Sequence, residues 1–206
     1  MKVLILNGSP RANGNTHLAL DEMIKIFKAN EIDVHYVQVG QMNIRGCIAC
    51  ASCHNGKDGC VFDDIVNELA PILKECDGMV IASPVYYANA NPTLISLLDR
   101  LFYSTSFDKR MKVGASVAVA RRGGCSSTFD QLNKYFTYSG MPLASSQYWN
   151  SVHGGAKGEA EQDLEGLQTM RTLANNMVFL MKSIQLGKEK FGLPQKEIPA
   201  RTSFIR

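Results

Sequence analysis

The chain has 206 residues, 45% of them hydrophobic, and a formal net charge of +3 at pH 7. This length and composition suit one α/β domain with a substantial core. The excess charge comes from residues 188–206, which hold five basic and two acidic residues. The balanced remainder argues against a nucleic-acid partner or an anionic membrane surface. No apolar run approaches the roughly 18 residues of a membrane span, so we expect a cytoplasmic protein with no membrane partner.

The first predicted element is a strand at Val3–Leu6. It leads into the loop N-G-S-P-R-A-N-G-N-T, after which helical periodicity begins at Thr16. A strand, loop and helix in this order direct backbone N–H groups and the positive end of a helix dipole at one point, which suits a phosphate. The loop has neither the G-x-x-x-x-G-K-S/T nor the G-x-G-x-x-G pattern, so a monophosphate suits it best. The alternative is an ordinary turn that binds nothing.

The next elements alternate between helix and strand. A helical apolar stripe is formed by Leu20, Met23, Ile24 and Phe27. Strands are predicted at Asp33–Val39 and Met79–Ala82. Between them lie a Gly-rich insertion at residues 40–63, which carries several cysteines, and a helix at Asp64–Glu75. Pro71 would either kink that helix or begin a new one.

The second half of the chain continues the alternation. Asn91 is suited to cap a helix that has Pro92 at its first position. The later predicted elements are a strand at Val113–Ala120, a helix with Phe129, Leu132 and Phe136 facing inward, a strand at Leu143–Trp149, and a helix from Asp163 to Leu186 that ends at Gly187. We therefore expect one domain over residues 1–187 and a C-terminal tail over residues 188–206. The last residues of the tail, Phe204, Ile205 and Arg206, are expected to dock onto a neighbouring subunit.

Strands that alternate with helices predict an α/β fold, in which a five-stranded parallel sheet is covered by helices on both faces. In such sheets, ligands bind beyond the carboxyl ends of the strands. Three loops follow predicted strands and would meet there, at residues 9–16, 83–87 and 121–124. The predicted pocket suits a flat ligand with a phosphate tail.

These three loops resemble those of the flavodoxin-like NAD(P)H-dependent FMN reductases. S-P-R-A-N-G-N-T at residues 9–16 is similar to the family's phosphate loop, S-P-V-Y at 83–86 to its flavin-edge loop, and R-R-G-G at 121–124 to a third flavin-contacting segment. The resemblance implies a three-layer sandwich with strand order 2-1-3-4-5, FMN as the cofactor, and a homodimer or homotetramer. The FMN-binding residues that it implies are Ser9, Arg11, Asn13, Gly14, Asn15, Thr16, Ser83, Pro84, Val85, Tyr86, Tyr87, Arg121, Arg122, Gly123 and Gly124.

Four of the six cysteines lie close together in the sequence. Cys47, Cys50, Cys53 and Cys60 have x2, x2 and x6 spacings in the segment C-I-A-C-A-S-C-H-N-G-K-D-G-C. This compact pattern resembles that of the iron-sulfur flavoproteins, a subgroup of the same family, and implies a [4Fe-4S] cluster. Zinc on four thiolates and unligated thiols are the alternatives. Cys76 is interpreted as a small buried hydrophobic residue and Cys125 as a loop thiol.

Two functional hypotheses follow from the resemblance. In the first, the protein is an FMN-dependent NAD(P)H oxidoreductase that passes electrons to a flavin, a quinone, a nitroaromatic compound or a redox protein. Flavin N5 then carries the chemistry, and no side chain is catalytic. In the second, the protein is an electron carrier that receives electrons from ferredoxin through the cluster. A third hypothesis, a regulatory protein that has lost FMN, is disfavoured by the intact donors of the first loop.

Overall fold

The computed structural model describes residues 1–56, 59–200, 202 and 204. Its centre is a parallel sheet in the order β2-β1-β3-β4-β5. The strands are β1 (Lys2–Asn7), β2 (Asp33–Gln38), β3 (Gly78–Pro84), β4 (Val113–Ala120) and β5 (Ser151–His153). The predicted α/β class and the predicted strand order are confirmed.

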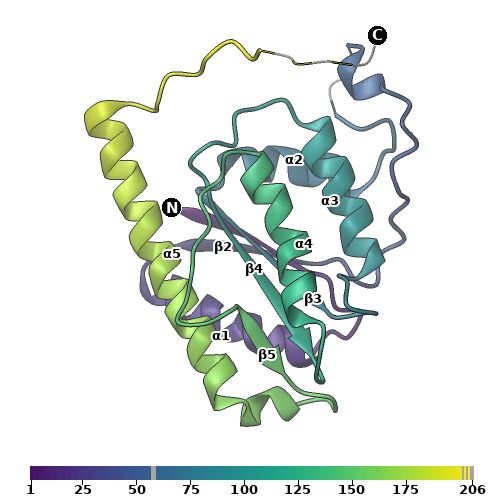
Figure 1. Ribbon diagram of the computed structural model, residues 1–206, viewed down its shortest axis with the longest axis vertical. Coiled ribbons are helices and arrows are strands. Elements are labelled where there is room, and N and C mark those ends of the chain that lie inside the picture. The colour runs from purple at the N-terminus through teal and green to yellow at the C-terminus, as the bar shows by residue number, and fades with distance from the viewer. Residues whose placement is uncertain (57–58, 201, 203, 205–206) are drawn as a thin grey trace.

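Helices cover both faces of the sheet and produce three layers (Figure 1). One face carries α1 (Asn15–Ala29) and α5 (Leu164–Phe191), and the other carries α2 (Ile65–Glu75), α3 (Pro92–Ser104) and α4 (Cys125–Tyr138). Short 3-10 helices lie at Ser52–His54 and Glu159–Gln162. Because successive side chains of a strand point to opposite faces, Val3 and Ile5 join the core beneath α1 and α5. Leu4 and Leu6 join the core on the other side.

Local sequence signals begin the helices of the second face. Asn91 caps α3 by accepting hydrogen bonds from the backbone N–H groups two and three residues ahead, and Pro92 opens the helix, as predicted. Asp64 caps α2 through its carboxylate, which accepts from Val66 N–H two residues ahead. Pro71 lies inside α2, which continues through it as one helix. In α4, Leu132 and Phe136 are buried as predicted, whereas Phe129 is half-buried.

The predicted fifth strand is wrong. Leu143–Trp149 does not join the sheet as a strand, although Leu143 forms an isolated bridge to β4. The strand is the later segment Ser151–His153, which pairs with the end of β4. One backbone carbonyl of the predicted segment is bonded to a helix instead of a strand. The side-chain amide of Asn176 in α5 donates to the carbonyl of Ser145 at 2.7 Å. Such bonds compete with ladder pairing.

The predicted end of α5 is also wrong. The helix continues to Phe191 and is capped by Gly192, so residues 188–191 belong to it. Gly192 has a φ of 73°, the left-handed conformation that glycine supplies at helix ends, whereas Gly187 is helical. No helix in the described residues, α5 with its 28 residues included, has both the length and the apolar character needed to cross a membrane.

The tail beyond α5 has no regular secondary structure over residues 192–200. Of the residues that were expected to dock onto a neighbouring subunit, Phe204 is 93% exposed. Ile205 and Arg206 lie outside the described residues. Docking of the tail therefore stays a prediction.

Candidate functional site

The first loop presents the start of α1 as an open anion site. Gly14 is the N-cap residue, no side chain caps the helix, and its first turn contains no acidic residue. Ser9, Asn15 and Thr16 are buried, whereas Arg11 and Asn13 are exposed at the rim. Uncapped N–H groups and the helix dipole favour a negative charge at this point.

Backbone contacts fix the shape of this loop. Arg11 N–H donates to Ser9 Oγ at 3.2 Å, and Gly14 N–H donates to Arg11 O at 3.2 Å. The side chain of Gln38, at the end of β2, donates to Ser9 O at 2.9 Å. Gly40 lies so close that a Cβ there would overlap the backbone of Ser9. Sequence reasoning missed Gly40, because this close approach joins two segments that are distant in the sequence.

Asn15 connects the first loop to the segment after β5. Its Nδ2 donates to Ala156 O at 2.9 Å, and its Oδ1 accepts from Gly158 N–H at 3.0 Å and Ala160 N–H at 3.3 Å. The side chain is thus committed within the protein. Its backbone N–H belongs to the first turn of α1, whose N–H groups have no partner within the helix.

The second loop is a tight turn at the end of β3. Tyr86 and Asn89 exchange backbone hydrogen bonds of 2.8 and 3.0 Å across it. The two residues inside this turn, Tyr87 and Ala88, have φ values of 50° and 60°. This left-handed conformation costs energy for any residue other than glycine, and it is concentrated at functional sites. Tyr87 is fully exposed. The hydroxyl of Ser83 is buried and accepts from Asn91 N–H at 2.8 Å, so Ser83 supports α3.

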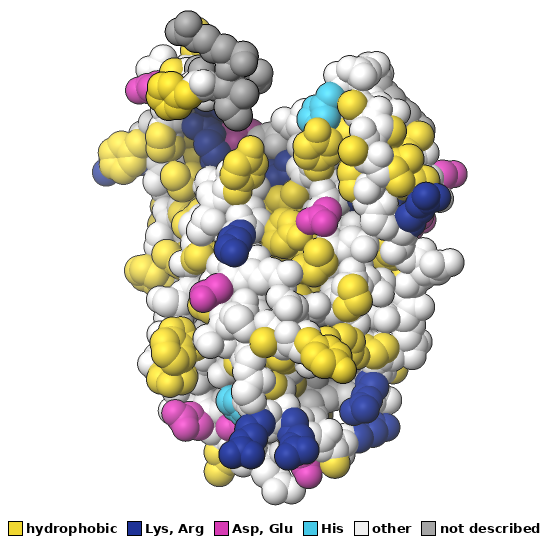
Figure 2. All heavy atoms as spheres, turned by 45° about the vertical axis from the view of Figure 1, so that its right-hand side comes forward, with side chains coloured by type: hydrophobic (Ala, Val, Ile, Leu, Met, Phe, Trp, Pro, Cys, Tyr) yellow, Lys and Arg dark blue, Asp and Glu magenta, His cyan; other side chains and the backbone are white. Residues whose placement is uncertain are grey.

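The third loop packs against the second. Gly124 has a φ of 93°, and a Cβ there would lie 2.8 Å from Val85 Cγ1 and 3.0 Å from Ala88 Cα. Only glycine satisfies both the conformation and the contact. Gly123 is exposed with open space around it. Arg121 and Arg122 are also exposed, and Figure 2 shows Lys and Arg side chains gathered at the lower end of the molecule.

A fourth segment, residues 154–160, completes the rim and was not predicted as part of the site. A Cβ at Gly155 would lie 2.9 Å from Arg121 Cγ, so this segment contacts the third loop as well as Asn15 of the first. The Glu159 carboxylate accepts from Gly155 N–H at 2.6 Å and Ala156 N–H at 2.8 Å. These backbone bonds, helped by Arg121, lower the pKa of Glu159. The structure thus brings the three predicted loops together at the carboxyl edge of the sheet.

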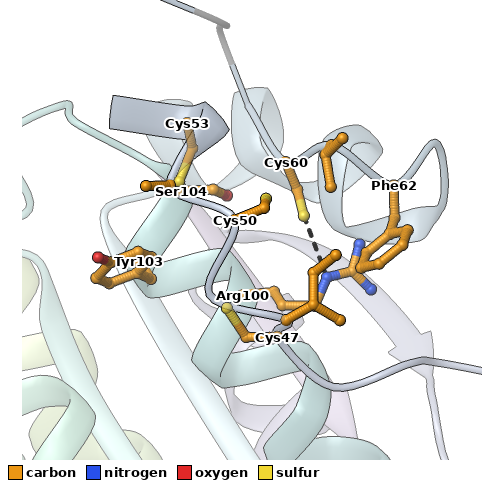
Figure 3. A pocket seen from close by; sticks show the side chains of 11 residues that line it. Cys47, Cys50, Cys53, Cys60, Phe62, Arg100, Tyr103 and Ser104 are labelled. Atoms are coloured by element: carbon orange, nitrogen blue, oxygen red, sulfur yellow. Dashed lines mark hydrogen bonds between the residues drawn. The ribbon is translucent and has the colours of Figure 1, made fainter. Parts of the chain in front are cut away.

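The four clustered cysteines line one pocket at the far end of α3 (Figure 3). The other lining residues include Phe62, Arg100, Tyr103 and Ser104. No disulfide joins any of the six cysteines, all of which are described. The surrounding backbone is unusual: Ala49, Ala51, Gly56 and Gly59 all have positive φ values. These tight bends of the backbone lie between and beside the four cysteines, which line one cavity.

The thiols of this pocket affect one another electrostatically. Burial raises the pKa of the Cys53 thiol, and repulsion from the other three thiolates raises it further. Two sulfurs accept N–H donors: Ala49 N–H lies 3.4 Å from Cys47 Sγ, and Arg100 Nε lies 3.2 Å from Cys60 Sγ. The Asn67 side chain clamps Cys60 by bonding both its N–H and its carbonyl oxygen, at 2.8 and 3.1 Å.

One polar atom in the pocket points to a missing group. Ser104 Oγ is buried and has no hydrogen-bond partner within the described part of the chain. A buried hydroxyl without a partner costs about 1–3 kcal/mol, so a group that accepts its hydrogen bond is expected in the cavity. A [4Fe-4S] cluster presents such acceptors as sulfides and thiolates. The four thiols and this hydroxyl are therefore chemically suited to a cluster, although no three His, Cys, Asp or Glu side chains in the described part of the chain are grouped closely enough to hold a metal ion.

The two remaining cysteines differ. Cys76 is buried as predicted, and burial raises its pKa to about 11. Cys125 is the first residue of α4 rather than a loop residue, and its Sγ lies 3.9 Å from His153 Nε2. The other ring nitrogen of His153 lies 3.6 Å from the carboxylate of Asp163, which caps α5. The side chains of Cys125, His153 and Asp163 therefore lie next to one another beside the third loop.

An open parallel sheet in the order 2-1-3-4-5, with a phosphate-type loop after its first strand, defines a flavodoxin-like protein. Residues 1–156 match the family model described as NADPH-dependent FMN reductase, and the chain belongs to this family. It is 32% identical over 194 residues to an iron-sulfur flavoprotein of Methanocaldococcus jannaschii, covering 90% of this chain and 100% of that protein. It is 29% identical to an iron-sulfur flavoprotein of Methanosarcina thermophila, covering 92% and 100% of the two chains.

Solved structures confirm the fold. RosB with the bound intermediate 8-demethyl-8-formylriboflavin-5′-phosphate superposes with a TM-score of 0.70 at 16% identity, covering 100% of this chain and 94% of that one. A flavodoxin from the domain Archaea superposes with a TM-score of 0.56 at 12% identity, covering 90% and 99% of the two chains. At such identities, the likeness concerns the arrangement of the chain alone.

Proposed function

We propose that this protein is an FMN-dependent redox protein that exchanges electrons with its partners through a [4Fe-4S] cluster. The observation that carries the proposal is the single pocket lined by Cys47, Cys50, Cys53 and Cys60, with the unpartnered hydroxyl of Ser104 beside them. The similarity to proteins named iron-sulfur flavoproteins supports it. FMN supplies hydride and single-electron chemistry, and the protein supplies binding and orientation.

The residues at the carboxyl edge have distinct parts in binding FMN. The uncapped start of α1 and the exposed Arg11 would hold the phosphate, because both present positive charge to one point. The turn around Tyr87 and the glycines of the third loop would border the flavin ring, since little side-chain bulk separates the two backbones at Gly124. Ser83 and Asn15 would act indirectly, by fixing the loops on which the contacting groups lie.

The similarity to proteins named iron-sulfur flavoproteins favours a cluster over a single zinc ion. Zinc needs its thiolates at about 2.3 Å from one point. A cube bonds each thiolate to a different iron atom, so its ligands need only surround a common cavity. The four cysteines line one such cavity.

A second candidate function is NAD(P)H oxidoreduction, which the description of the matching family favours. Arg121 and Arg122 are adjacent, exposed cations at the rim of the flavin edge, where they would attract the phosphates of a nicotinamide nucleotide. The two functions differ in the electron donor and share the FMN site.

The test is a spectrum and a metal analysis of protein purified without oxygen. We expect flavin bands with broad additional absorption, and about four iron atoms per chain. Zinc in place of iron, or a colourless protein that ignores added FMN, would contradict the proposal. Addition of NAD(P)H alone then separates the two functions: rapid bleaching of the flavin indicates an oxidoreductase, and bleaching that requires reduced ferredoxin indicates a carrier.

We also propose that the protein assembles as a homodimer or homotetramer. Four large apolar side chains of α5, those of Leu164, Phe179, Leu186 and Phe191, are each exposed over 66% or more of their surface, and the first three lie on one side of the helix, within about 60° around its axis. Large apolar side chains gathered on one exposed helix mark an association surface. Light scattering is expected to give twice or four times the mass of 22.7 kDa of one chain. The mass of a single chain would contradict this proposal.

A further inference from the structure

Arg100 is a buried charge whose position demands an explanation. It is 1% exposed, and it is among the largest fully buried side chains in the described structure. Asp64 compensates its charge through two hydrogen bonds, Nη1 to Oδ2 at 2.6 Å and Nη2 to Oδ1 at 2.9 Å. The guanidinium also lies 4.8 Å from the centre of the Phe62 ring, and Nη1 donates to Arg45 O at 3.1 Å.

Stability alone does not account for this arrangement. Replacing a buried ion pair with apolar side chains of similar volume is often neutral or stabilising, because both charges lose their hydration. An apolar pair would lack the Nε–H group of Arg100, which does not bond Asp64. Nε donates to Cys60 Sγ at 3.2 Å and so directs a positive charge at one of the four thiols (Figure 3).

Ser104 adds a second donor from the same helix. It follows Arg100 by four residues on α3, so both side chains lie on one face of the helix. Both line the cysteine pocket, and the hydroxyl of Ser104 is one of two buried side-chain groups without a partner in the described residues, the other being that of Thr128 in α4. Two donors from one rigid helix therefore face a cavity that is surrounded by sulfur.

We propose that Arg100, assisted by Ser104, is a positioning residue that raises the reduction potential of a cluster bound by the four cysteines. The proposal rests on the proposed function. Reduction adds one electron, supplied by an external low-potential reductant, and breaks no bond. The added negative charge is stabilised by a nearby cation and by N–H and O–H donors to sulfur, and hydrogen bonds to the sulfurs are a known determinant of cluster potentials. Asp64 moderates the effect, because its charge opposes that of Arg100.

Arg100 and Asp64 together allow a test that distinguishes an electrostatic role of Arg100 from a purely structural one. Potentials are measured by anaerobic redox titration of the cluster spectrum in the complete protein. Arg100→Gln is expected to lower the potential, changing the ratio of oxidised to reduced cluster at a fixed potential about tenfold, or about 59 mV for one electron. Asp64→Asn is expected to raise it, because the charge of Arg100 is then uncompensated. Asparagine also caps helices well, so α2 keeps its N-cap.

Three further variants complete the experiment. Arg45→Gln removes an exposed cation that lies over the Phe62 ring, beside the pocket rather than in its lining, and solvent screening should leave the potential nearly unchanged. Ser104→Ala should lower the potential by less than Arg100→Gln does. If Arg100→Gln loses its iron, Arg100→Lys replaces it, with a smaller decrease expected.

The outcomes separate the two proposals. Shifts of opposite sign for Arg100→Gln and Asp64→Asn support the role of Arg100. Shifts in the same direction, unchanged potentials, or loss of iron from both Arg100 variants show that the pair is only structural and overturn it. Wild-type protein without iron would instead overturn the proposed cluster itself.

Discussion

Replacing Gly40 with alanine is expected to weaken FMN binding at least tenfold and to lower the free energy of unfolding by about 2 kcal/mol. The new Cβ would overlap the backbone of Ser9 and lie 2.5 Å from Gly8 O. Backbone atoms cannot move aside as a flexible side chain can, so the first loop must shift away from the start of α1. The loss should be measured by fluorescence titration with FMN and by denaturant unfolding.

Riboflavin and a second glycine provide the controls for this variant. Because the damage is confined to the phosphate loop, the affinity for riboflavin should fall much less than that for FMN. Gly187→Ala makes the same chemical change in the interior of α5, where no atom lies within 4 Å of the new Cβ. It should raise stability by about 0.5–1 kcal/mol. Unchanged FMN affinity in Gly40→Ala would show that the first loop does not hold the phosphate.

Cys53→Ala is expected to remove nearly all of the bound iron while leaving the flavin in place. A cube bound by three thiolates has one iron without a protein ligand and is easily lost. The flavin should remain, because the cysteine pocket and the second loop lie at opposite ends of α3, a helix about 20 Å long. Iron and flavin content per chain, measured on the same anaerobic sample, check both halves of the prediction.

Cys125→Ser is the matched control for this experiment. Cys125 is also half-buried, but it lies beside His153 and does not line the cysteine pocket. Its iron content should equal that of the wild type. Full iron content in Cys53→Ala would remove Cys53 from the ligand set, and equal losses in both variants would indicate general damage.

Chemical signals that are local in the sequence proved reliable. Asn91 followed by Pro92 predicts the start of α3, and the apolar run before Asn7 predicts β1, because capping and strand formation involve neighbouring residues. The alternation of such elements predicts a parallel sheet covered on both faces and the meeting of three loops, whereas the strand order came from the resemblance to a known family. The x2 and x2 cysteine spacings likewise predict a shared pocket, since a few residues of chain suffice to bring those sulfurs together.

The sequence by itself therefore determined the class of fold, the three loops and the four cysteines. Only the tertiary structure decided that β5 begins at Ser151, that Gly40 supports the first loop, and that Arg100 reaches Cys60 across 40 positions of the chain. Such contacts depend on how whole elements pack. No window of neighbouring residues contains both partners, so their pairing becomes visible only once the sheet and its helices are assembled.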